Sequence, residues 1–298
     1  MPSISNPSIG NWVVQSSGVS KRPIEGAFTI DVEDWYQSSV DFDAPITERV
    51  VRNVNTILEL LKEFDVKATF FVQGRVAETF PKLLEDILAE GHEIQSHGYS
   101  HRPLFGMSRA ELRQELELSR KTVEDACGVS VTAFRAPDFS IVQHNLWALE
   151  ILAESGFTVD SSIFPIKMKR YGIAGWETGP RYYPLQNGAS IWEVPVAVWG
   201  RGRVRIPMAG GGYFRLLPEI ILKRALHSMI ASKRMVVIYC HPYEFSKNEL
   251  DAYRKTVSRR FRFTQNLGRG AFVKRIRSLL QEFAFGRFDE LLSSRGIK

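Results

Sequence analysis

Hydrophobic residues recur along this chain at two alternating spacings, one typical of β-strands and one of α-helices. Short apolar runs predict strands at residues 27–32, 67–72, 92–97, 131–135, 157–159, 191–198 and 235–240. Between them, apolar positions three or four residues apart predict helices at residues 47–64, 81–90, 108–127, 145–154 and 218–232. This regular alternation predicts an α/β fold with parallel strands joined by right-handed crossovers.

Three segments depart from the alternation. Residues 1–25 are rich in Ser, Asn and Pro without periodicity, which predicts a mobile N-terminal arm. Residues 166–190 are interrupted by Gly, Pro and aromatic residues, which favours a long functional loop. Residues 254–277 are rich in Arg with amphipathic spacing, typical either of a solvated helix closing the fold or of a patch contacting anionic lipid or polymer. We therefore expect one domain at residues 26–245 and a basic helical extension at residues 246–298.

Composition narrows the class of protein. The 298 residues fit a single α/β barrel of about 250 residues, and 44% hydrophobic with 24% charged residues is ordinary for a globular protein. Cys127 and Cys240 are too far apart for a thiolate zinc cluster. The chain contains neither a long apolar stretch nor a secretory-signal pattern, so a cytoplasmic location is the expectation.

Charge is distributed unevenly. Residues 1–200 hold 18 Lys and Arg against 26 Asp and Glu, a balance of −8, whereas residues 201–298 hold 21 against 7, a balance of +14. The asymmetry predicts an acidic partner or an anionic surface near the C-terminal part, with peripheral contact at the inner face of a membrane as one form of it. No nucleic-acid-binding motif accompanies the basic charge, so we expect no nucleic-acid partner. The sequence gives no indication of oligomeric state.

Candidate metal ligands follow two of the predicted strands. In β/α folds the reactive side chains lie at the carboxyl ends of the strands. Asp31, Glu33 and Asp34 end the first strand, and His97 and His101 follow the third. One carboxylate with two imidazoles is a donor set for a catalytic divalent cation, zinc first, with cobalt, nickel or manganese as alternatives.

The sequence leaves the identity of the carboxylate ligand open. If the first strand continues past Asp31, alternation places Glu33 on the same face. If the strand ends at Asp31, Asp34 could turn toward the histidines instead. The sequence pattern is compatible with either carboxylate as the ligand.

Two further strand ends carry charged groups. Arg135 follows the fourth strand, and its rigid fork of donors could hold a carboxylate such as Asp31 in its ionised form. Pro137 fixes the turn that follows, so amide N–H groups near Asp138 could face the cavity. His241 ends the last strand, and its position among the other groups favours a general acid.

In this order, these motifs resemble the polysaccharide deacetylases, the NodB-homology enzymes of carbohydrate esterase family 4. The resemblance runs from about residue 28 to residue 241. A narrower likeness to deacetylases associated with exopolysaccharide and exosortase loci rests on the segments DVEDWYQ, HGYSH, FRAPDFS, VDSSIFP, GGGYFRLLP and YCHPYEF. The resemblance implies a distorted (β/α)7 barrel, similar to a TIM barrel, that binds one divalent metal ion and removes N-acetyl groups from N-acetylhexosamine units of a glycan, releasing acetate.

The resemblance also implies roles for individual residues. Asp31 would be the general base, Arg135 would orient it, and His241 would be the general acid. His97 and His101 would bind the metal together with Glu33 or Asp34. An amide N–H near Asp138 would face the oxyanion, and the expected substrate-binding residues are Asp138, Pro137, Phe139, Tyr99 and Trp35.

Two departures from the family pattern affect this interpretation. The family's adjacent aspartates are replaced here by the Asp31, Glu33 and Asp34 series, and its Asp-Trp pair, which supports the acid histidine, is not evident at residues 160–164. Two other functions remain as alternatives. One is a metal-independent amidohydrolase of cyclic ureides on a related barrel, and the other is a catalytically silent polysaccharide-binding module.

Overall fold

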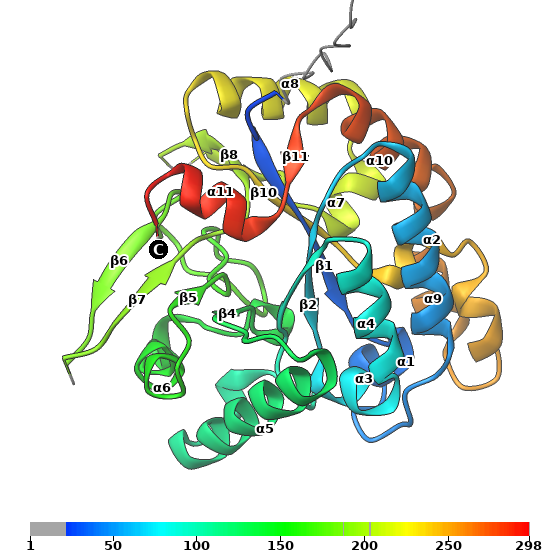
Figure 1. Ribbon diagram of the computed structural model, residues 1–298. Helices are drawn as coiled ribbons and strands as arrows, with labels where there is room; N and C mark the ends of the chain where they lie inside the picture. Colours follow the sequence, from blue (N-terminus) through cyan, green and yellow to red (C-terminus); the bar gives the residue numbers. More distant parts are fainter. Residues whose placement is uncertain (1–21, 187, 203, 298) are drawn as a thin grey trace, which may run out of the picture.

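The computed structural model describes residues 22–186, 188–202 and 204–297, so most of the arm predicted at residues 1–25 lies outside the described residues. Figure 1 shows strands in the middle of the molecule with helices around them. The strands are β1 (Gly26–Val32), β2 (Thr69–Val72), β3 (Glu93–Ser96), β4 (Ala133–Phe134), β5 (Val159–Asp160), β6 (Arg181–Pro184), β7 (Ser190–Glu193), β8 (Val198–Arg201), β9 (Val204–Pro207), β10 (Val237–Cys240) and β11 (Phe285–Gly286).

Helices occupy most of the chain between the strands. They are α1 (Trp35–Ser39), α2 (Arg49–Glu63), α3 (Gly74–Thr79), α4 (Pro81–Ala89), α5 (Arg109–Cys127), α6 (Ala148–Glu154), α7 (Gly211–Leu216), α8 (Glu219–Ala231), α9 (Arg259–Asn266), α10 (Arg269–Glu282) and α11 (Phe288–Ser294). Helix α5 begins with a capping box, in which the side chains of Ser108 and Glu111 each accept from the other residue's backbone N–H.

The sheet has the strand order expected of an incomplete barrel. Seven parallel strands run β10-β1-β2-β3-β4-β5-β7, and β6 adds an antiparallel edge. Between β7 and β10 no continuous strand pairing closes the barrel in the described part of the chain. The contacts there include a hydrogen bond from Ala197 N–H to Val237 O (2.8 Å) and a bridge between Gly210 and Tyr239. The predicted distorted (β/α)7 barrel is therefore confirmed.

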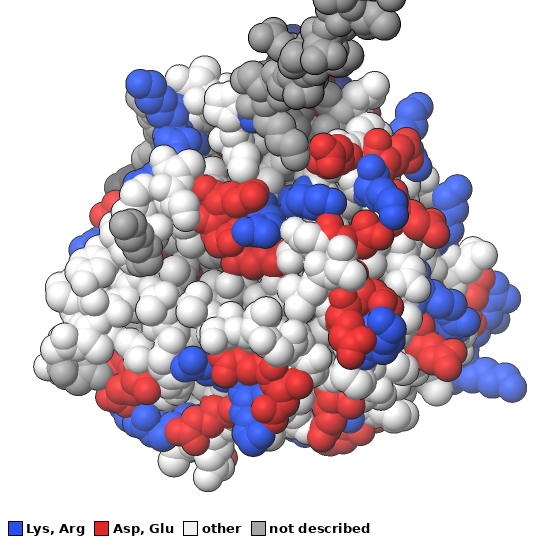
Figure 2. Space-filling model, viewed as in Figure 1, with Lys and Arg blue, Asp and Glu red and all other residues white. Residues whose placement is uncertain are grey.

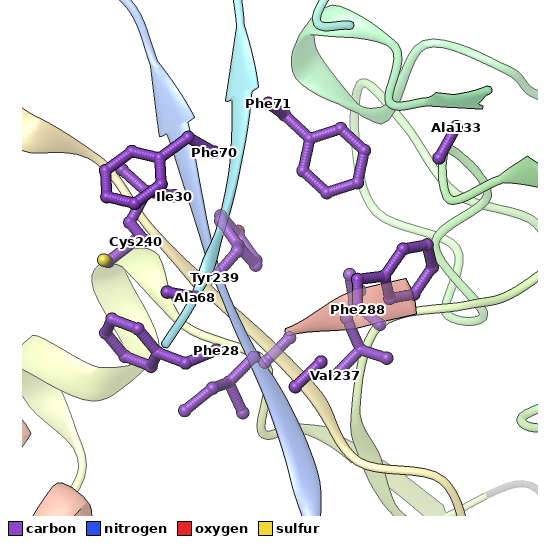
Figure 3. Packing of buried hydrophobic residues seen from close by; sticks show 14 of the residues in the cluster. Phe28, Ile30, Ala68, Phe70, Phe71, Ala133, Val237, Tyr239, Cys240 and Phe288 are labelled. Carbon is purple, nitrogen blue, oxygen red and sulfur yellow. The ribbon is translucent and has the colours of Figure 1, made fainter. Parts of the chain in front are cut away.

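Alternation along the strands separates the outer core from the barrel interior. Figure 3 shows Phe28, Phe70 and Cys240 on one side of the strands and Phe71 and Phe288 on the other. All five are buried. Side chains alternate along a strand, so every second residue of β1 points into the barrel, and some of these residues are polar.

The C-terminal segment is part of this barrel. Strand β11 pairs with the start of β1, with Gly26 opposite Phe285. The Phe288 N–H then donates to Thr69 Oγ1 (2.7 Å), and the Phe288 ring packs on Phe71 with centroids 5.9 Å apart. The extension predicted at residues 246–298 is thus mainly helical, but it also contributes one strand to the central sheet.

Some elements differ from the sequence prediction. The apolar run at residues 191–198 forms parts of two strands, because Pro195 lies between β7 and β8 and cannot donate to a sheet ladder. The segment at residues 166–190 contains β6, whose residues are mostly exposed and therefore lack the apolar alternation of a buried strand. Helix α3 was not predicted, since it is only six residues long.

Candidate metal centre and active site

The carboxyl ends of four parallel strands bring the candidate residues to one pocket. Asp31 and Glu33 come from the end of β1, and the histidines come from the segments after β3 and β10. The pocket has a volume of about 170 Å³ and is lined by Asp31, Glu33, Ser39, His97, His101, Ala136, Asp138, Phe139, Tyr171, Tyr239, His241 and Tyr243. The structure thus gathers residues from widely separated parts of the sequence into one site.

Three of these residues form a potential metal centre. Ligand atoms of Glu33, His97 and His101 all lie within 4.8 Å of one another, and all three residues are buried. Glu33 Oε2 contacts His101 Nε2 directly and lies 3.6 Å from His97 Nε2. His101 adopts a positive φ of 64°, a conformation that few non-glycine residues occupy, so the chain turns sharply to bring this ring inward.

The hydrogen bonds of the triad fit a bound cation. His97 Nδ1 donates to Arg135 O (2.8 Å), so in the neutral ring the lone pair of Nε2 faces Glu33 and is available to a cation. Within the described part of the chain, Glu33 Oε2 and His101 Nδ1 are buried without a hydrogen bond. Burying unpartnered polar atoms is costly, and a cation between the donors would compensate the one on Glu33. Two imidazoles and one carboxylate form a donor set used by catalytic zinc sites.

The charges in the triad depend on one another. Burial alone would raise the pKa of Glu33, but the neighbouring imidazoles, above all the charge of His101, hold it well below its usual value. Burial opposes the charged form of His101, yet the Glu33 carboxylate raises the pKa of this ring. Glu33 is therefore ionised, as a metal ligand must be.

Asp34, the alternative ligand, lies outside the triad. Its Oδ1 accepts from the Tyr36 N–H (3.0 Å) at the start of α1, and its Oδ2 accepts from the Thr47 N–H (3.0 Å). The Asp34 carboxylate is thus used as a helix cap. Strand β1 continues to Val32, so alternation turns Glu33 into the pocket, and the expectation that Asp34 could bind the metal is corrected.

Asp31 and Arg135 form a buried pair beside the triad. Arg135 Nη1 donates to Asp31 Oδ1 and to Thr29 Oγ1, each at 2.7 Å. Arg135 is completely buried, and its guanidinium carbon lies 4.1 Å from the centroid of the Phe71 ring. The guanidinium therefore fixes the position of the Asp31 carboxylate, as the sequence suggested it could.

His241 is supported from behind by Glu244. His241 Nδ1 lies 3.3 Å from Glu244 Oε2, and Glu244 Oε1 lies 3.2 Å from Arg215 Nε. On the pocket side, His241 Nε2 lies 3.9 Å from Glu33 Oε1. Burial lowers the pKa of His241, but the Glu244 hydrogen bond and the charges of Glu33, Glu244 and Asp31 outweigh it and raise the pKa to about 9. The support missing at residues 160–164 is supplied by this glutamate three residues after the histidine.

The segment after β4 supplies part of the pocket wall. Asp138 and Phe139 both line it, and both have positive φ angles, 55° and 49°. The Asp138 carboxylate accepts from Arg170 Nη2 (2.9 Å) in the segment after β5. Their positions agree with the predicted contact to substrate, while the oxyanion role of the Asp138 N–H stays a prediction.

Three other expected substrate-binding residues lie elsewhere. Trp35 is 1% exposed and packs against Tyr253 and Phe261, so it cannot stack on a sugar. Tyr99 donates its hydroxyl to Glu78 Oε2 (2.8 Å) on α3 and does not line the described pocket. Pro137 is buried and does not line the described pocket. The expectations for Trp35 and Pro137 are corrected, because both side chains are buried, whereas the part-exposed Tyr99 stays a prediction.

The pocket also contains aromatic residues that sequence reasoning missed. Tyr171, Tyr239 and Tyr243 line it, and the Tyr243 ring stacks on His241 with centroids 4.8 Å apart. Tyr239 could have been found, because it lies two positions before His241 on β10 and so shares its face. Tyr171 had no such signal, since it lies in an irregular segment.

Two protein-family models match segments of this chain. Residues 39–159 match the family model described as "Polysaccharide deacetylase", and residues 161–293 match "Domain of unknown function (DUF3473)". The chain carries a polysaccharide deacetylase domain. The link to exosortase loci stays a prediction.

Curated relatives of this deacetylase domain match about a third of the chain. A peptidoglycan-N-acetylglucosamine deacetylase of Bacillus cereus is 37% identical over 32% of this chain and 34% of its own length. A peptidoglycan deacetylase of Helicobacter pylori is 32% identical over 36% of each protein. A chitooligosaccharide deacetylase of Sinorhizobium fredii is 30% identical over 39% of this chain and 54% of its own length. The chain thus spans about a third to a half of the length of these relatives.

Solved structures share the fold over nearly the whole chain. A candidate polysaccharide deacetylase from Mycobacterium smegmatis matches with a TM-score of 0.59 and 22% identity, covering 91% of both chains. An allantoinase matches with a TM-score of 0.56 and 17% identity, covering 91% of this chain and 89% of the other. At such identities the likeness concerns the barrel.

Two buried carboxyl groups of the deacetylase barrel lie outside the pocket. Asp160 on β5 accepts from Ser162 N–H (3.2 Å), and Glu193 on β7 accepts from Trp176 Nε1 (2.9 Å). Burial raises the pKa of Asp160 to about 7 despite the bonds from Ser162. Burial and the nearby Asp160 charge raise the pKa of Glu193 well above its usual value. Both groups are therefore protonated in the folded protein at mildly acidic pH.

This arrangement predicts a pH-dependent stability. The raised pKa of Asp160 stabilises the fold fully below its unfolded value near 4, and this contribution is lost as pH rises through about 7. The free energy of unfolding should therefore fall between pH 4 and 7 more steeply in the wild type than in Asp160→Asn, by up to about 1.4 kcal/mol per pH unit. Urea unfolding at several pH values measures both slopes. Asp125→Asn, a change on the exposed face of α5, should follow the wild type, and equal slopes for Asp160→Asn would contradict the prediction.

Proposed function

We propose that this chain is a metal-dependent N-deacetylase that removes acetyl groups from N-acetylhexosamine units of a glycan. The observation that carries the proposal is the convergence in one pocket of a Glu-His-His centre, the Arg135-bound carboxylate of Asp31 and the Glu244-supported ring of His241. The polysaccharide deacetylase match and the printed activities of the peptidoglycan and chitooligosaccharide deacetylases support the same reaction.

Glu33, His97 and His101 would hold the divalent cation. Zinc is our first assignment, because two imidazoles and a carboxylate are a donor set of catalytic zinc sites, with cobalt, nickel or manganese as alternatives. When bound, such a cation supplies Lewis-acid polarisation of a carbonyl group and lowers the pKa of water. The chain contributes the orientation of the donors, above all through the bond from His97 Nδ1 to Arg135 O.

Asp31 would act as the general base. Its Oδ1 accepts from Arg135, so we assign acceptance of the proton of the attacking water to Oδ2. The Arg135 guanidinium holds the carboxylate in position, and Thr29 Oγ1 accepts from the same guanidinium nitrogen. The pair thus presents a base at a fixed position on the floor of the pocket.

His241 would donate the proton that the departing amine needs. An amine anion is a very poor leaving group, so cleavage of the amide requires proton transfer to nitrogen. The raised pKa of His241, about 9, keeps the ring protonated at neutral pH. Glu244 engages Nδ1 from behind, which leaves Nε2 directed toward Glu33 and the pocket.

The size of the pocket suits part of a sugar unit. Its 170 Å³ is below the roughly 300–1,000 Å³ of sites that enclose a whole small ligand. A second hollow, of about 560 Å³, is lined by residues that include Phe42, Arg102 and Phe105. Arg102 directly follows the metal-ligand candidate His101 in the sequence. We assign the acetamido group to the inner pocket and the neighbouring sugar units to this outer hollow.

Acetate release from a panel of acetylated glycans tests the function. We expect release from chitooligosaccharides or peptidoglycan fragments, loss of release with a chelator, and recovery when zinc or another divalent ion is added. The same panel should include cyclic ureides, because an allantoinase shares the fold. Chelator-resistant ureide hydrolysis would favour that alternative, and glycan binding without turnover would favour a silent binding module.

A further inference from the structure

Helix α9 is an unusual element of this chain because it buries none of its own residues against the rest of the protein. None of its eight residues is buried, although the sequence RRFRFTQN contains two phenylalanines. Phe263 is 67% exposed and Leu267, at the end of the helix, is 41% exposed. Large apolar side chains gathered on an exposed element commonly mark a contact surface.

The exposed apolar and basic residues share one face of α9. Positions three or four apart lie on the same side of a helix, which aligns Arg259 and Arg260 with Phe263 and then Leu267. We call these four residues the α9 face. Phe261 points differently, toward Trp35, with centroids 6.1 Å apart. Gly268, which follows Leu267, lies in close contact with the backbone of Arg215. The exposed Leu216 at the end of α7, the residue after Arg215, therefore lies next to this face.

The segment of sequence that contains α9 carries only positively charged side chains. Residues 252–281 contain nine Lys and Arg and no Asp or Glu. Elsewhere the two signs are mixed, and Figure 2 shows acidic and basic side chains interspersed over the face viewed there. Two of these charges are paired, Arg254 with Asp251 and Arg277 with Glu63, whereas Arg259 and Arg260 make no ion pair with the described residues. The positive charge of these two arginines therefore remains open to an anionic partner.

This face is held firmly beside the pocket. The Arg215 side chain donates to Gln265 O at the end of α9, and Arg275 Nη1 donates to Phe214 O (2.9 Å). Arg269 Nη1 donates to the carbonyl oxygen of Tyr243, a residue that lines the pocket. Whatever binds the α9 face is therefore held close to the site.

We infer that the α9 face docks on a membrane surface rich in anionic lipid. In the described part of the chain no helix combines the length and apolarity needed to cross a bilayer. Arg259 and Arg260 pair with lipid phosphates, while Phe263 and Leu267 enter the boundary of the acyl chains. A soluble polyanion would use the arginines alone and leave the exposed Phe263 and Leu267 without a role. Docking of this kind presents the pocket to glycans carried at the membrane.

Vesicle co-sedimentation of the full chain tests this inference. We expect binding to phosphatidylcholine vesicles containing 30% phosphatidylglycerol and little binding to phosphatidylcholine alone. Arg259→Gln/Arg260→Gln should weaken binding about twenty-five-fold, since each basic residue near an anionic surface contributes about a fivefold factor. Phe263→Ser should weaken it about tenfold through loss of apolar insertion. Arg259→Lys/Arg260→Lys should retain most of the binding.

Matched control variants separate this face from the general charge. Arg113→Gln/Lys121→Gln removes the same charge from α5, and Tyr182→Ser removes an aromatic side chain that is 51% exposed on β6. Both should bind vesicles as the wild type does. The inference is overturned if the anionic vesicles are not bound, if the controls lose as much affinity as the test variants, or if Phe263→Ser has no effect while heparin competes fully. None of these readouts depends on deacetylase activity.

Discussion

Asp31→Asn is expected to lower kcat for acetate release about a thousandfold, within the roughly 10²–10⁴ range that a general base contributes. The asparagine oxygen can still accept from Arg135, so the guanidinium keeps a partner and the barrel stays folded. What is lost is the oxygen able to take up a proton. Steady-state kinetics on an acetylated oligosaccharide measures the effect, with metal content determined on the same sample.

The metal content distinguishes a lost base from a lost site. Asp31→Asn should retain its divalent ion, because Asp31 is not a member of the Glu33, His97 and His101 cluster. Asp125→Asn, which removes an exposed carboxylate on α5, should keep wild-type kcat. Near-normal turnover by Asp31→Asn would mean that another group accepts the proton and that the role given to Asp31 is wrong.

His97→Ala is expected to reduce bound metal from about one ion per chain to below a tenth and to abolish measurable acetate release. The imidazole offers Nε2 to the cluster while Nδ1 is fixed on Arg135 O, so alanine removes one of three donors. Elemental analysis after dialysis measures the metal. His144→Ala, at an exposed position outside the pocket, provides the control and should leave metal content and activity unchanged.

The same measurement separates the two acidic candidates after β1. Glu33→Gln should lose metal as His97→Ala does, because its carboxylate contacts the histidines. Asp34→Asn should keep the ion and show only a lower thermal stability, of about 1 kcal/mol, through the weakened cap of α1. The opposite pattern would transfer the ligand role to Asp34.

The sequence was sufficient for the barrel and for most polar groups of the pocket. Strand periodicity located β1, β3, β4 and β10, and parallel strands necessarily gather their carboxyl ends at one edge. The same alternation offered Glu33 as a ligand, but only the observed length of β1 decides between Glu33 and Asp34. Short-range sequence patterns thus identify the candidate ligands, and the residue at which each strand ends determines which candidate reaches the pocket.

Long-range packing was beyond the sequence patterns. Trp35 looks like a sugar-stacking residue in sequence, yet Tyr253, far along the chain, covers it. Strand β11 has only two residues, too few for an alternation signal, and it pairs with β1 across nearly the whole chain. Both features depend on the C-terminal segment returning to the barrel, which no local spacing encodes.

The proposed function requires that Glu33, His97 and His101 hold one divalent cation. An anomalous difference map from crystals grown with zinc tests it most directly. We expect one strong peak within about 2.0–2.2 Å of one Glu33 carboxylate oxygen and of Nε2 of both histidines. No peak in the pocket, or a peak bonded to Asp34 and only one of the histidines, would contradict it.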